Sequence, residues 1–406
     1  MNNLGIKSEV DDLPQIPVNN CCGCTACASI CPTKAIHMRP NQEGFLYPEI
    51  DIDRCCNCNK CEKACPIINP PELPDAFEGC AVAQSCDNQV LNESTSGGFV
   101  DTLCKYVLDD IGGYVCGVEF DSEFMPRHRI VHTYEEAKAF RNSKYAQSNL
   151  DGVFSDILRL LREEKTVMFI GTPCQVAGLK TYLGIDYDNL ITVDLVCRSI
   201  PSPKLWRMYL EWQKKRYGSD IKKVVCRKKT YGYHSGALEI DFENGKHYAG
   251  SNRVDYYMKS FHKDICSRLS CYDCQFKTKH RCSDFTVFDS WRPDTVVKRP
   301  FVDNDRGYSN ILVHTVKGKG IMYHLNGIDL NITDTERLLS VMGSMIAASV
   351  KYPKERDTFY KELEVVGFYK TVKRYVCVSV KDRVIEWAKP IRYVFKQRKI
   401  VRYSKE

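Results

Sequence analysis

CCGCTACASICP, residues 21–32, returns as CCNCNKCEKACP at residues 55–66. Both copies have the form C-x2-C-x2-C-x3-C-P, and their thiols belong to Cys21, Cys24, Cys27 and Cys31 in the first copy and to Cys55, Cys58, Cys61 and Cys65 in the second. A zinc ribbon separates two C-x2-C pairs by a longer spacer, whereas each copy here gathers its thiols in one short run. The spacing therefore favours iron–sulfur clusters over zinc.

The repeated motif has the spacing of a bacterial ferredoxin, in which the fourth cysteine of each run ligates the other run's 4Fe-4S cluster. We therefore predict one cluster on Cys21, Cys24, Cys27 and Cys65, and a second on Cys55, Cys58, Cys61 and Cys31. Two clusters in one small module lie close enough for electrons to pass between them, so we expect an electron-transfer role. Cys22 and Cys56, each beside a ligand, are expected to be buried non-ligands.

The composition predicts two or three globular domains. The chain has 406 residues, of which 43% are hydrophobic, and 22 of them are cysteines. The first twenty residues are polar and acidic and contain no apolar secretion signal, and no run of eighteen apolar residues occurs. We therefore expect a cytoplasmic protein whose cysteines are metal ligands or core residues rather than disulfides.

Strand and helix patterns alternate in the body. Buried strands are predicted at 112–120, 166–171 and 190–197, and helices at 96–108, 150–163, 172–183 and 202–216, the third with Thr172 as its N-cap. The predicted fold is an α+β ferredoxin-like dicluster module followed by a larger α/β body and a helical basic C-terminal tail. Its segments are a disordered lead-in (1–16), the dicluster domain (17–69), a linker (70–79), two parts of the body (80–165 and 166–335) and the tail (336–406).

Positive charge is concentrated at the C-terminus. Between residues 370 and 406, twelve Lys or Arg face three Asp or Glu, whereas the net charge of the whole chain is only +7. Such a tail could lie on an anionic membrane surface or bind a partner, but a packed helix with a solvated charged face is preferred. No nucleic-acid-binding motif is present, so nucleic acid is not an expected partner.

Five further segments carry a resemblance. They are SGG at 96–98, SKYAQS at 143–148, GTPCQVAGLK at 171–180, VDLVCRSIPSP at 193–203 and RLSCYDC at 268–274. In this order they resemble the coenzyme F420 hydrogenase/dehydrogenase beta-subunit family, over roughly residues 80–315. The resemblance implies a flavoprotein, with FAD, that transfers electrons between iron–sulfur clusters and an organic substrate by hydride transfer.

The resemblance also implies which residues bind the flavin. A Ser-Gly-Gly turn before a helix allows close backbone approach to a phosphate, and a cation, an aromatic ring and hydroxyls suit a ribityl–phosphate arm. The alternative is a plain turn and an ordinary polar loop. The cofactor-binding candidates are Ser96, Gly97, Gly98, Ser143, Lys144, Tyr145, Ser148, Thr172 and Gln175.

A third 4Fe-4S cluster is implied by family members that hold one in this body. Its candidate ligands are Cys174, Cys197, Cys271 and Cys274, and the competing interpretation is buried cysteines plus a small zinc site. Cys174 is expected to have a lowered pKa at its helix N-terminus. Cys266 and Cys282 are candidate substitutes, and the remaining cysteines are expected in the core, namely Cys80, Cys86, Cys104, Cys116, Cys226 and Cys377.

The chain departs from the family where the family commonly has a His-Gly pair and a Gly-Asp-x-Trp-Gly stretch. Here Arg198 and Ser199 replace the pair, and Phe288 and Arg292 replace the two glycines. These changes make F420 itself a less expected substrate, and Arg198 and Arg292 could bind an anionic one or be solvated at the surface. His234 is the candidate proton donor.

The sequence therefore predicts an iron–sulfur flavin-dependent oxidoreductase. A ferredoxin or another redox protein would supply electrons, and a small organic substrate would accept a hydride. The first alternative is an electron-transfer subunit that passes electrons to a partner protein and has no substrate of its own. The second alternative is an iron–sulfur sensor.

Overall fold

The N-terminal module is a small α+β unit. The computed structural model describes residues 20–298 and 301–403, so the predicted lead-in at 1–16 lies outside the described residues. Strands β1 (Ile36–Pro40) and β2 (Leu46–Ile50) pair antiparallel, with Ile36 opposite Ile50. The third cysteine of each run lies in a short helix, Cys27 in α1 (Ala26–Ile30) and Cys61 in α2 (Lys60–Lys63). The expected ferredoxin-like dicluster arrangement is confirmed.

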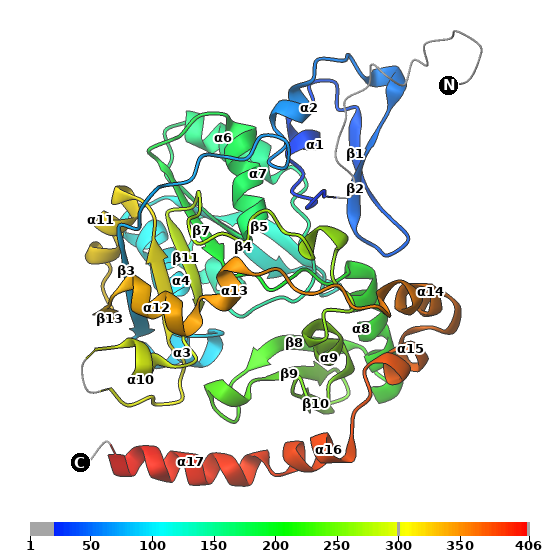
Figure 1. Cartoon of the computed structure of the whole chain (residues 1–406), viewed down its shortest axis with the longest axis vertical. Helices are drawn as coiled ribbons and strands as arrows, with labels where there is room; N and C mark the ends of the chain where they lie inside the picture. Colours follow the sequence, from blue (N-terminus) through cyan, green and yellow to red (C-terminus); the bar gives the residue numbers. More distant parts are fainter. Residues whose placement is uncertain (1–19, 299–300, 404–406) are drawn as a thin grey trace.

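The body is built on a mixed eight-stranded sheet with the strand order β13-β3-β12-β11-β7-β6-β4-β5 (Figure 1). Its parallel centre comprises β4 (Tyr114–Phe120), β6 (Val167–Gly171), β7 (Leu190–Leu195) and β11 (Phe285–Asp289). Antiparallel strands flank it, namely β5 (Pro126–Val131), β12 (Ser309–Val313), β3 (Gly79–Ser85) and β13 (Ile328–Ile332). The partly parallel sheet expected from the sequence is confirmed.

Strand β6 is buried on both faces, which explains its continuous apolar run. Val167 and Phe169 pack with α6 (Val153–Arg162) and α7 (Pro173–Leu183) on one face. Met168 and Ile170 pack with α4 (Phe99–Lys105) on the other. Because successive strand residues point to opposite faces, this run fixes both helical layers. The polar residues at the carboxyl ends of the central strands are therefore available to form a site.

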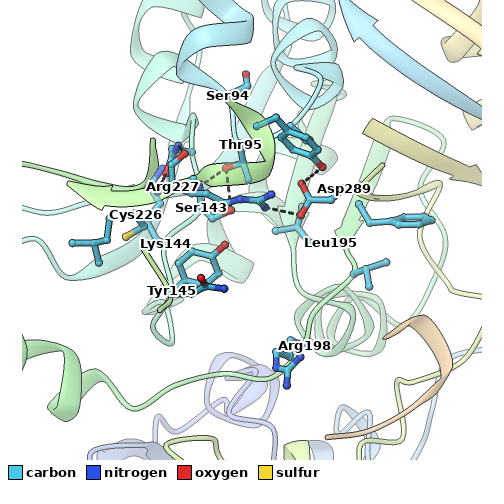
Figure 2. Close-up of a pocket in the computed structure, with 18 of the residues that line it drawn as sticks. Ser94, Thr95, Ser143, Lys144, Tyr145, Leu195, Arg198, Cys226, Arg227 and Asp289 are labelled. Atoms are coloured by element: carbon cyan, nitrogen blue, oxygen red, sulfur yellow. Dashed lines mark hydrogen bonds and ion pairs between the residues drawn. The ribbon is translucent and has the colours of Figure 1, made fainter. Parts of the chain in front are cut away.

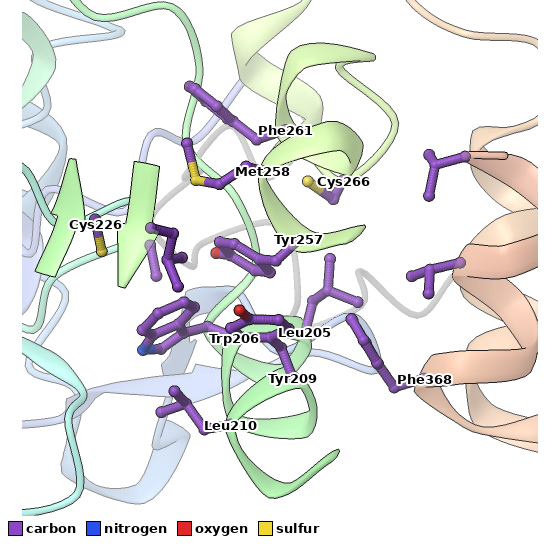
Figure 3. Packing of buried hydrophobic residues seen from close by; sticks show 14 of the residues in the cluster. Leu205, Trp206, Tyr209, Leu210, Cys226, Tyr257, Met258, Phe261, Cys266 and Phe368 are labelled. Carbon is purple, nitrogen blue, oxygen red and sulfur yellow. The ribbon is translucent and has the colours of Figure 1, made fainter. Parts of the chain in front are cut away.

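A second, three-stranded antiparallel sheet was not predicted. It comprises β8 (Ile221–Lys228), β9 (Ala237–Phe242) and β10 (His247–Gly250) and packs with α8 (Pro203–Tyr217) and α9 (Tyr256–His262). Its core is aromatic, with the rings of Trp206 and Tyr257 4.8 Å apart (Figure 3). Tyr209 buries its ring there and donates a 2.7 Å hydrogen bond to Asp255, so this polar group is satisfied.

The chain after residue 335 is helical, as expected. Its helices are α12 (Thr335–Met342), α13 (Ser344–Ala347), α14 (Arg356–Val366), α15 (Phe368–Tyr375), α16 (Val380–Trp387) and α17 (Lys389–Tyr403). The remaining α-helices of the described residues are α3 (Asn88–Glu93), α5 (Tyr134–Ala137), α10 (Pro293–Val296) and α11 (Val316–His324). Within residues 20–298 and 301–403, no helix has both the length and the apolar content that crossing a membrane requires.

Candidate functional site

The first predicted cluster set comes together around a small cavity. Its lining includes Cys21, Cys24 and Cys27 of the first run and Cys65 of the second. Burial raises the pKa of Cys27, and the nearby thiols of Cys21 and Cys65 raise it further. Thiols that repel one another as anions fit a cationic iron cluster, since such a cluster removes the cost of ionising them together.

The second set lies nearer the surface. Cys31 is among the groups that raise the pKa of Cys61, after burial and the neighbouring Glu62. The pKa of Cys31 lies below its usual value. Burial raises this pKa, but hydrogen bonds from Thr33 and from backbone N–H groups lower it by more. Cys58 is exposed and Cys55 half-buried. This set is therefore the more accessible of the two from solvent.

The four cysteines of the predicted third cluster are neighbours, although they come from three distant segments. After burial, Cys271 and Cys174 raise the pKa of Cys197 well above its usual value, and Cys274 contributes as well. Burial raises the pKa of Cys271 to about 12, again with contributions from Cys274 and Cys174. The described residues contain no group of three or more His, Cys, Asp or Glu side chains arranged around a single metal ion. Four thiolates are the number that either a 4Fe-4S cluster or a structural zinc ion takes.

The expected low pKa of Cys174 is wrong. A hydrogen bond with Cys22 is the largest cause that raises it, followed by burial, and the pKa lies well above its usual value. The hydrogen bond with Cys174 lowers the pKa of Cys22. A second hydrogen bond, with Cys24, and burial together raise this pKa by more. Cys22 is therefore a link between the first cluster loop and the body.

A buried arginine also joins the first cluster loop to the body. Arg268 is 1% exposed and donates from Nε to the carbonyl of Cys21 at 2.7 Å and from Nη2 to the carbonyl of Leu46 at 2.9 Å. Its guanidinium lies 4.0 Å from the ring centroid of Tyr47. Sequence reasoning missed Arg268, although it lies inside the quoted RLSCYDC segment. It joins the dicluster module to the segment that carries Cys271.

Two further contacts fix the module on the body. A Cβ on Gly178 of α7 would lie 2.8 Å from Cys24 Sγ, so only glycine leaves room for the cluster loop. Arg356 of α14 donates two hydrogen bonds of 2.7 and 2.6 Å to the carboxylate of Glu43. The C-terminal segment, which carried no predicted chemistry, thus helps to hold the dicluster module.

A cavity of about 1110 Å³ lies between the two sheets. Of the nine predicted cofactor-binding residues, eight line it, namely Ser96, Gly98, Ser143, Lys144, Tyr145, Ser148, Thr172 and Gln175. Cys197 lines it too, so the third cysteine group borders the cavity. The cavity also takes residues from β8 and from α16 and α17.

Gly97 is not among the residues that line the cavity, and glycine is required at this position for a different reason. A Cβ there would lie 2.2 Å from the carbonyl oxygen of Ala83 and 2.6 Å from the nitrogen of Ser309. The turn therefore needs glycine to pass β3 and β12, rather than to approach a ligand as the sequence suggested. Lys229 stabilises this turn by donating to the carbonyl oxygen of Ser96 at 2.7 Å.

Arg227 is the most prominent lining residue that sequence reasoning missed. Its Nη1 donates to Asp289 at 2.6 Å, and Tyr233 donates to the same carboxylate at 2.9 Å (Figure 2). The guanidinium lies 4.6 Å from the ring centroid of Trp291. Its buried Nη2 has no hydrogen-bond partner among the described residues. A buried N–H that lacks a partner at a cavity wall fits an anionic ligand oxygen.

The predicted polar residues form a connected wall. Ser143 donates its N–H to Thr95 Oγ1 at 2.8 Å, and Gln175 donates to Ser148 Oγ at 3.0 Å. Thr172 and Gln175 form the capping box of α7, which confirms the predicted N-cap. Burial lowers the pKa of Lys144 to about 7, and its amine donates to the carbonyls of Ala139 and Arg141, both at 2.8 Å.

The three catalytic candidates differ in position. Arg198 lines the cavity but is held by Asp264, with two hydrogen bonds of 2.8 Å. His234 lines it as well, and its Nε2 lies 2.7 Å from Asp303 Oδ2. Arg292 is not among the lining residues, and 65% of its side chain is exposed. The structure therefore separates the two arginines that the sequence had paired.

The other cysteines divide by exposure. Cys80, Cys104, Cys116, Cys226 and Cys266 are buried, and Cys282 is half-buried. Cys22 is half-buried rather than buried, and the expectation of burial is wrong for Cys56, Cys86 and Cys377, which are exposed. These three lie on a short loop or near the end of an element, where periodicity gives little information.

Two stretches of the chain match known families. Residues 20–67 match the family described as "4Fe-4S dicluster domain", and residues 164–335 match the C-terminal domain of the family described as "Coenzyme F420 hydrogenase/dehydrogenase, beta subunit". This chain joins these two domains. The resemblance inferred from its motifs is confirmed: the chain is similar to these beta subunits over residues 164–335 and to 4Fe-4S dicluster domains over residues 20–67.

A curated relative and a solved structure are also similar to this chain. It is 26% identical over 315 residues to a Methanocaldococcus jannaschii protein named "Coenzyme F420-dependent sulfite reductase". That match covers 73% of the chain but 46% of the relative, so the chain spans about half the relative's length. The F420-reducing [NiFe] hydrogenase complex from Methanosarcina barkeri gives a TM-score of 0.45 at 17% identity, covering 71% of this chain and 93% of that one.

Proposed function

We propose that this protein is an iron–sulfur flavoprotein oxidoreductase. It takes electrons at its N-terminal clusters and delivers them through FAD to a small organic acceptor. The observation that carries the proposal is a series of neighbouring thiols: the Cys22 thiol is hydrogen-bonded to the thiols of Cys24 and Cys174, and Cys197, a neighbour of Cys174, lines the large cavity.

The cysteines of the body would hold a third 4Fe-4S cluster. Cys174, Cys197, Cys271 and Cys274 supply four thiolates, the number such a cluster takes. Lys277 is among the groups that favour ionised Cys197 and Cys274. A zinc ion on the same thiolates is the competing occupant, and metal analysis separates the two.

The cavity would hold the organic cofactor. Arg227 offers its free N–H to a phosphate, while Ser143, Ser148 and Thr172 supply hydroxyls. When bound, a flavin stores single electrons from clusters and passes on a pair as hydride. Because the pKa of Lys144 is about 7, its amine is able to release or take up a proton at the cavity wall near neutral pH.

The cavity volume favours an enzyme over an electron-transfer subunit. At about 1110 Å³ it lies slightly above the usual range for ligand pockets, about 300 to 1,000 Å³. A relay to a partner protein needs only an exposed cofactor edge. The name of the curated relative makes F420 the competing cofactor, because F420 could occupy the same cavity.

A ferredoxin or a similar redox protein would deliver electrons at the second cluster. Its ligand Cys58 is exposed, so a donor can approach it closely. The domain boundaries that we propose fall after residues 69, 79, 165 and 335.

Anaerobic purification tests the proposal. We expect about twelve iron and twelve sulfide per chain, as three cubanes require, together with one FAD identified by mass. About eight iron atoms together with zinc would refute the third iron–sulfur cluster. F420 in place of FAD would refute the assignment of a flavin. Iron without either organic cofactor would refute the proposed oxidoreductase activity.

A paired substitution tests the cofactor site. Arg227→Gln removes the unpaired N–H and should weaken FAD binding roughly 10- to 100-fold, the usual effect of losing a charged hydrogen bond. Arg207→Gln, an exposed residue of α8, is the control and should leave binding unchanged. Equal binding by both variants would contradict the assignment.

A further inference from the structure

Helices α16 and α17 form an almost straight rod along one edge of the molecule (Figure 1). The side chains on the inner face of this rod belong to the body. Lys389, Tyr393 and Lys396 line the large cavity, and Tyr393 contacts the ring of Tyr231 at 6.3 Å. The rod is therefore a wall of the cavity rather than a loose tail.

The acidic side chains of the rod are all used for anchoring. Asp382 accepts a 2.9 Å hydrogen bond from Lys259, and Glu386 accepts from Ser251 N and Oγ at 3.0 and 2.6 Å. Lys396 pairs with buried Asp305 at 2.9 Å. These contacts hold one face of the rod against the body and direct its negative charge inward.

The outer face carries a stripe of large apolar side chains. Val380, Val384, Trp387 and Ile391 are 77%, 57%, 75% and 51% exposed, and Phe395, which is 65% exposed but also lines the cavity, lies at the edge of the stripe. Their spacing of three or four residues places them on one side of a helix, and the stripe continues across the junction at Ala388. The sequence favours a packed helix with a solvated charged face. The structure packs the inner face and exposes this apolar stripe.

Only cations accompany the stripe. Between Val380 and Ile400, a range that the structure describes throughout, the exposed charged residues are Lys381, Arg383 and Arg398, together with Arg392 and Lys399, which also line the cavity. No Asp or Glu in that range is exposed. The surface thus combines an apolar stripe that contains a tryptophan with uniformly positive flanks, the composition of helices that lie in a membrane interface.

We propose that the outer face of α16 and α17 binds an anionic lipid surface. Apolar side chains would enter the acyl boundary, and the flanking cations would meet negative headgroups. A second copy of the chain is a poor occupant, because paired rods would bring like charges together. Since the inner face of the rod lines the cavity, binding would place the cavity beside the lipid. The proposal rests on this surface and not on the proposed redox function.

Vesicle binding by the full-length holoprotein tests the proposal. We expect sedimentation with phosphatidylcholine vesicles that contain phosphatidylglycerol, weaker binding at high salt, and little binding to phosphatidylcholine alone. Brominated lipid should quench Trp387, and the quenching should be lost in Trp387→Phe. Equal affinity for both vesicle types, or no affinity for either, would overturn the proposal.

Matched variants identify the surface. Trp387→Ser should weaken vesicle binding at least about tenfold, whereas Val316→Ser, which alters a 73% exposed residue of α11, should not. Neutralising Arg383 and Arg398 to Gln should weaken it by roughly 30-fold, and the control is Lys222→Gln on β8. A soluble dimer broken by Trp387→Ser, or binding only to an acidic protein, would replace the lipid as occupant and overturn the proposal.

Discussion

Arg268 Nε donates a 2.7 Å hydrogen bond to the carbonyl oxygen of Cys21, so a side chain of the body holds the first ligand loop of the dicluster module. Arg268 also donates to Gln147 Oε1 at 3.2 Å and lies three residues before Cys271. One buried guanidinium thus fixes two cysteine groups relative to each other. Because electron transfer depends on separation, this contact bears directly on the proposed path.

Arg268→Met tests that contact. It removes every donor from this site and leaves two buried carbonyls unsatisfied, so we expect a loss of about 2 kcal/mol or more in the free energy of unfolding. Electron transfer into the body should slow at least about tenfold. Urea unfolding and stopped-flow absorbance measure the two effects. Arg207→Met is the exposed control, and identical behaviour of the two variants would exclude a role for Arg268.

Gly178→Ala tests the close packing of α7 against the cluster loop. The new methyl would lie 2.7 Å from Cys24 Cβ, so we expect a loss of about 1 to 3 kcal/mol and a lower iron content. Gly320→Ala in α11 has no heavy atom within 4 Å of the new methyl and should stabilise by about 0.5 to 1 kcal/mol. A stable, fully loaded Gly178→Ala protein would show that the two domains do not touch there.

Cys271→Ser tests the third cluster. Removing one thiolate should lower the iron content by about four per chain and leave the N-terminal clusters in place. Cys226→Ser, which alters a buried cysteine outside the three groups, should keep the full content. Iron, sulfide and zinc analysis measures the difference. Loss of zinc with unchanged iron would assign the site to zinc.

Stability should fall as the pH falls from about 6.5 towards 5. Burial lowers the pKa of His128 to about 4, whereas the unfolded chain titrates near 6.5. Between these values the unfolded state binds more protons, so acid favours unfolding by about 1 to 2 kcal/mol at pH 5. Urea midpoints measured from pH 7 to 5 should show this slope.

His128→Gln should reduce that pH dependence but not abolish it, because burial also lowers the pKa of His262 to about 4 and that of His314 to about 3. His37→Gln, which alters an exposed residue of β1, should leave it unchanged. The His128 ring stacks on Phe169 at 5.3 Å, so the variant will also be less stable at every pH. The slope, and not the absolute stability, is therefore the quantity to compare. Equal slopes in the wild type and His128→Gln would contradict the buried neutral histidine.

Local signals explain what the sequence could predict. The Thr172–Gln175 capping box and the apolar run of β6 depend on neighbours along the chain, and both are found as expected. The spacing of the two cysteine runs also predicts that the fourth cysteine of each run lies with the first three of the other run. The structure places Cys65 beside Cys21 and Cys27, as that pattern requires.

Long-range contacts explain what it could not predict. Arg227 meets Asp289 across 62 residues, and Arg356 meets Glu43 across 313. The role of Gly97 depends on two strands that pass behind it. No periodicity encodes such pairs, because each requires the whole body to be folded.

Rapid mixing of the anaerobic protein with reduced ferredoxin tests the central claim most directly. We predict that the clusters bleach first and that the cavity cofactor is reduced afterwards. In Cys24→Ser, reduction of the cofactor by ferredoxin should be abolished, although dithionite or another small reductant still reduces it. Unchanged ferredoxin-driven reduction in Cys24→Ser would contradict the path from the N-terminal clusters to the cavity.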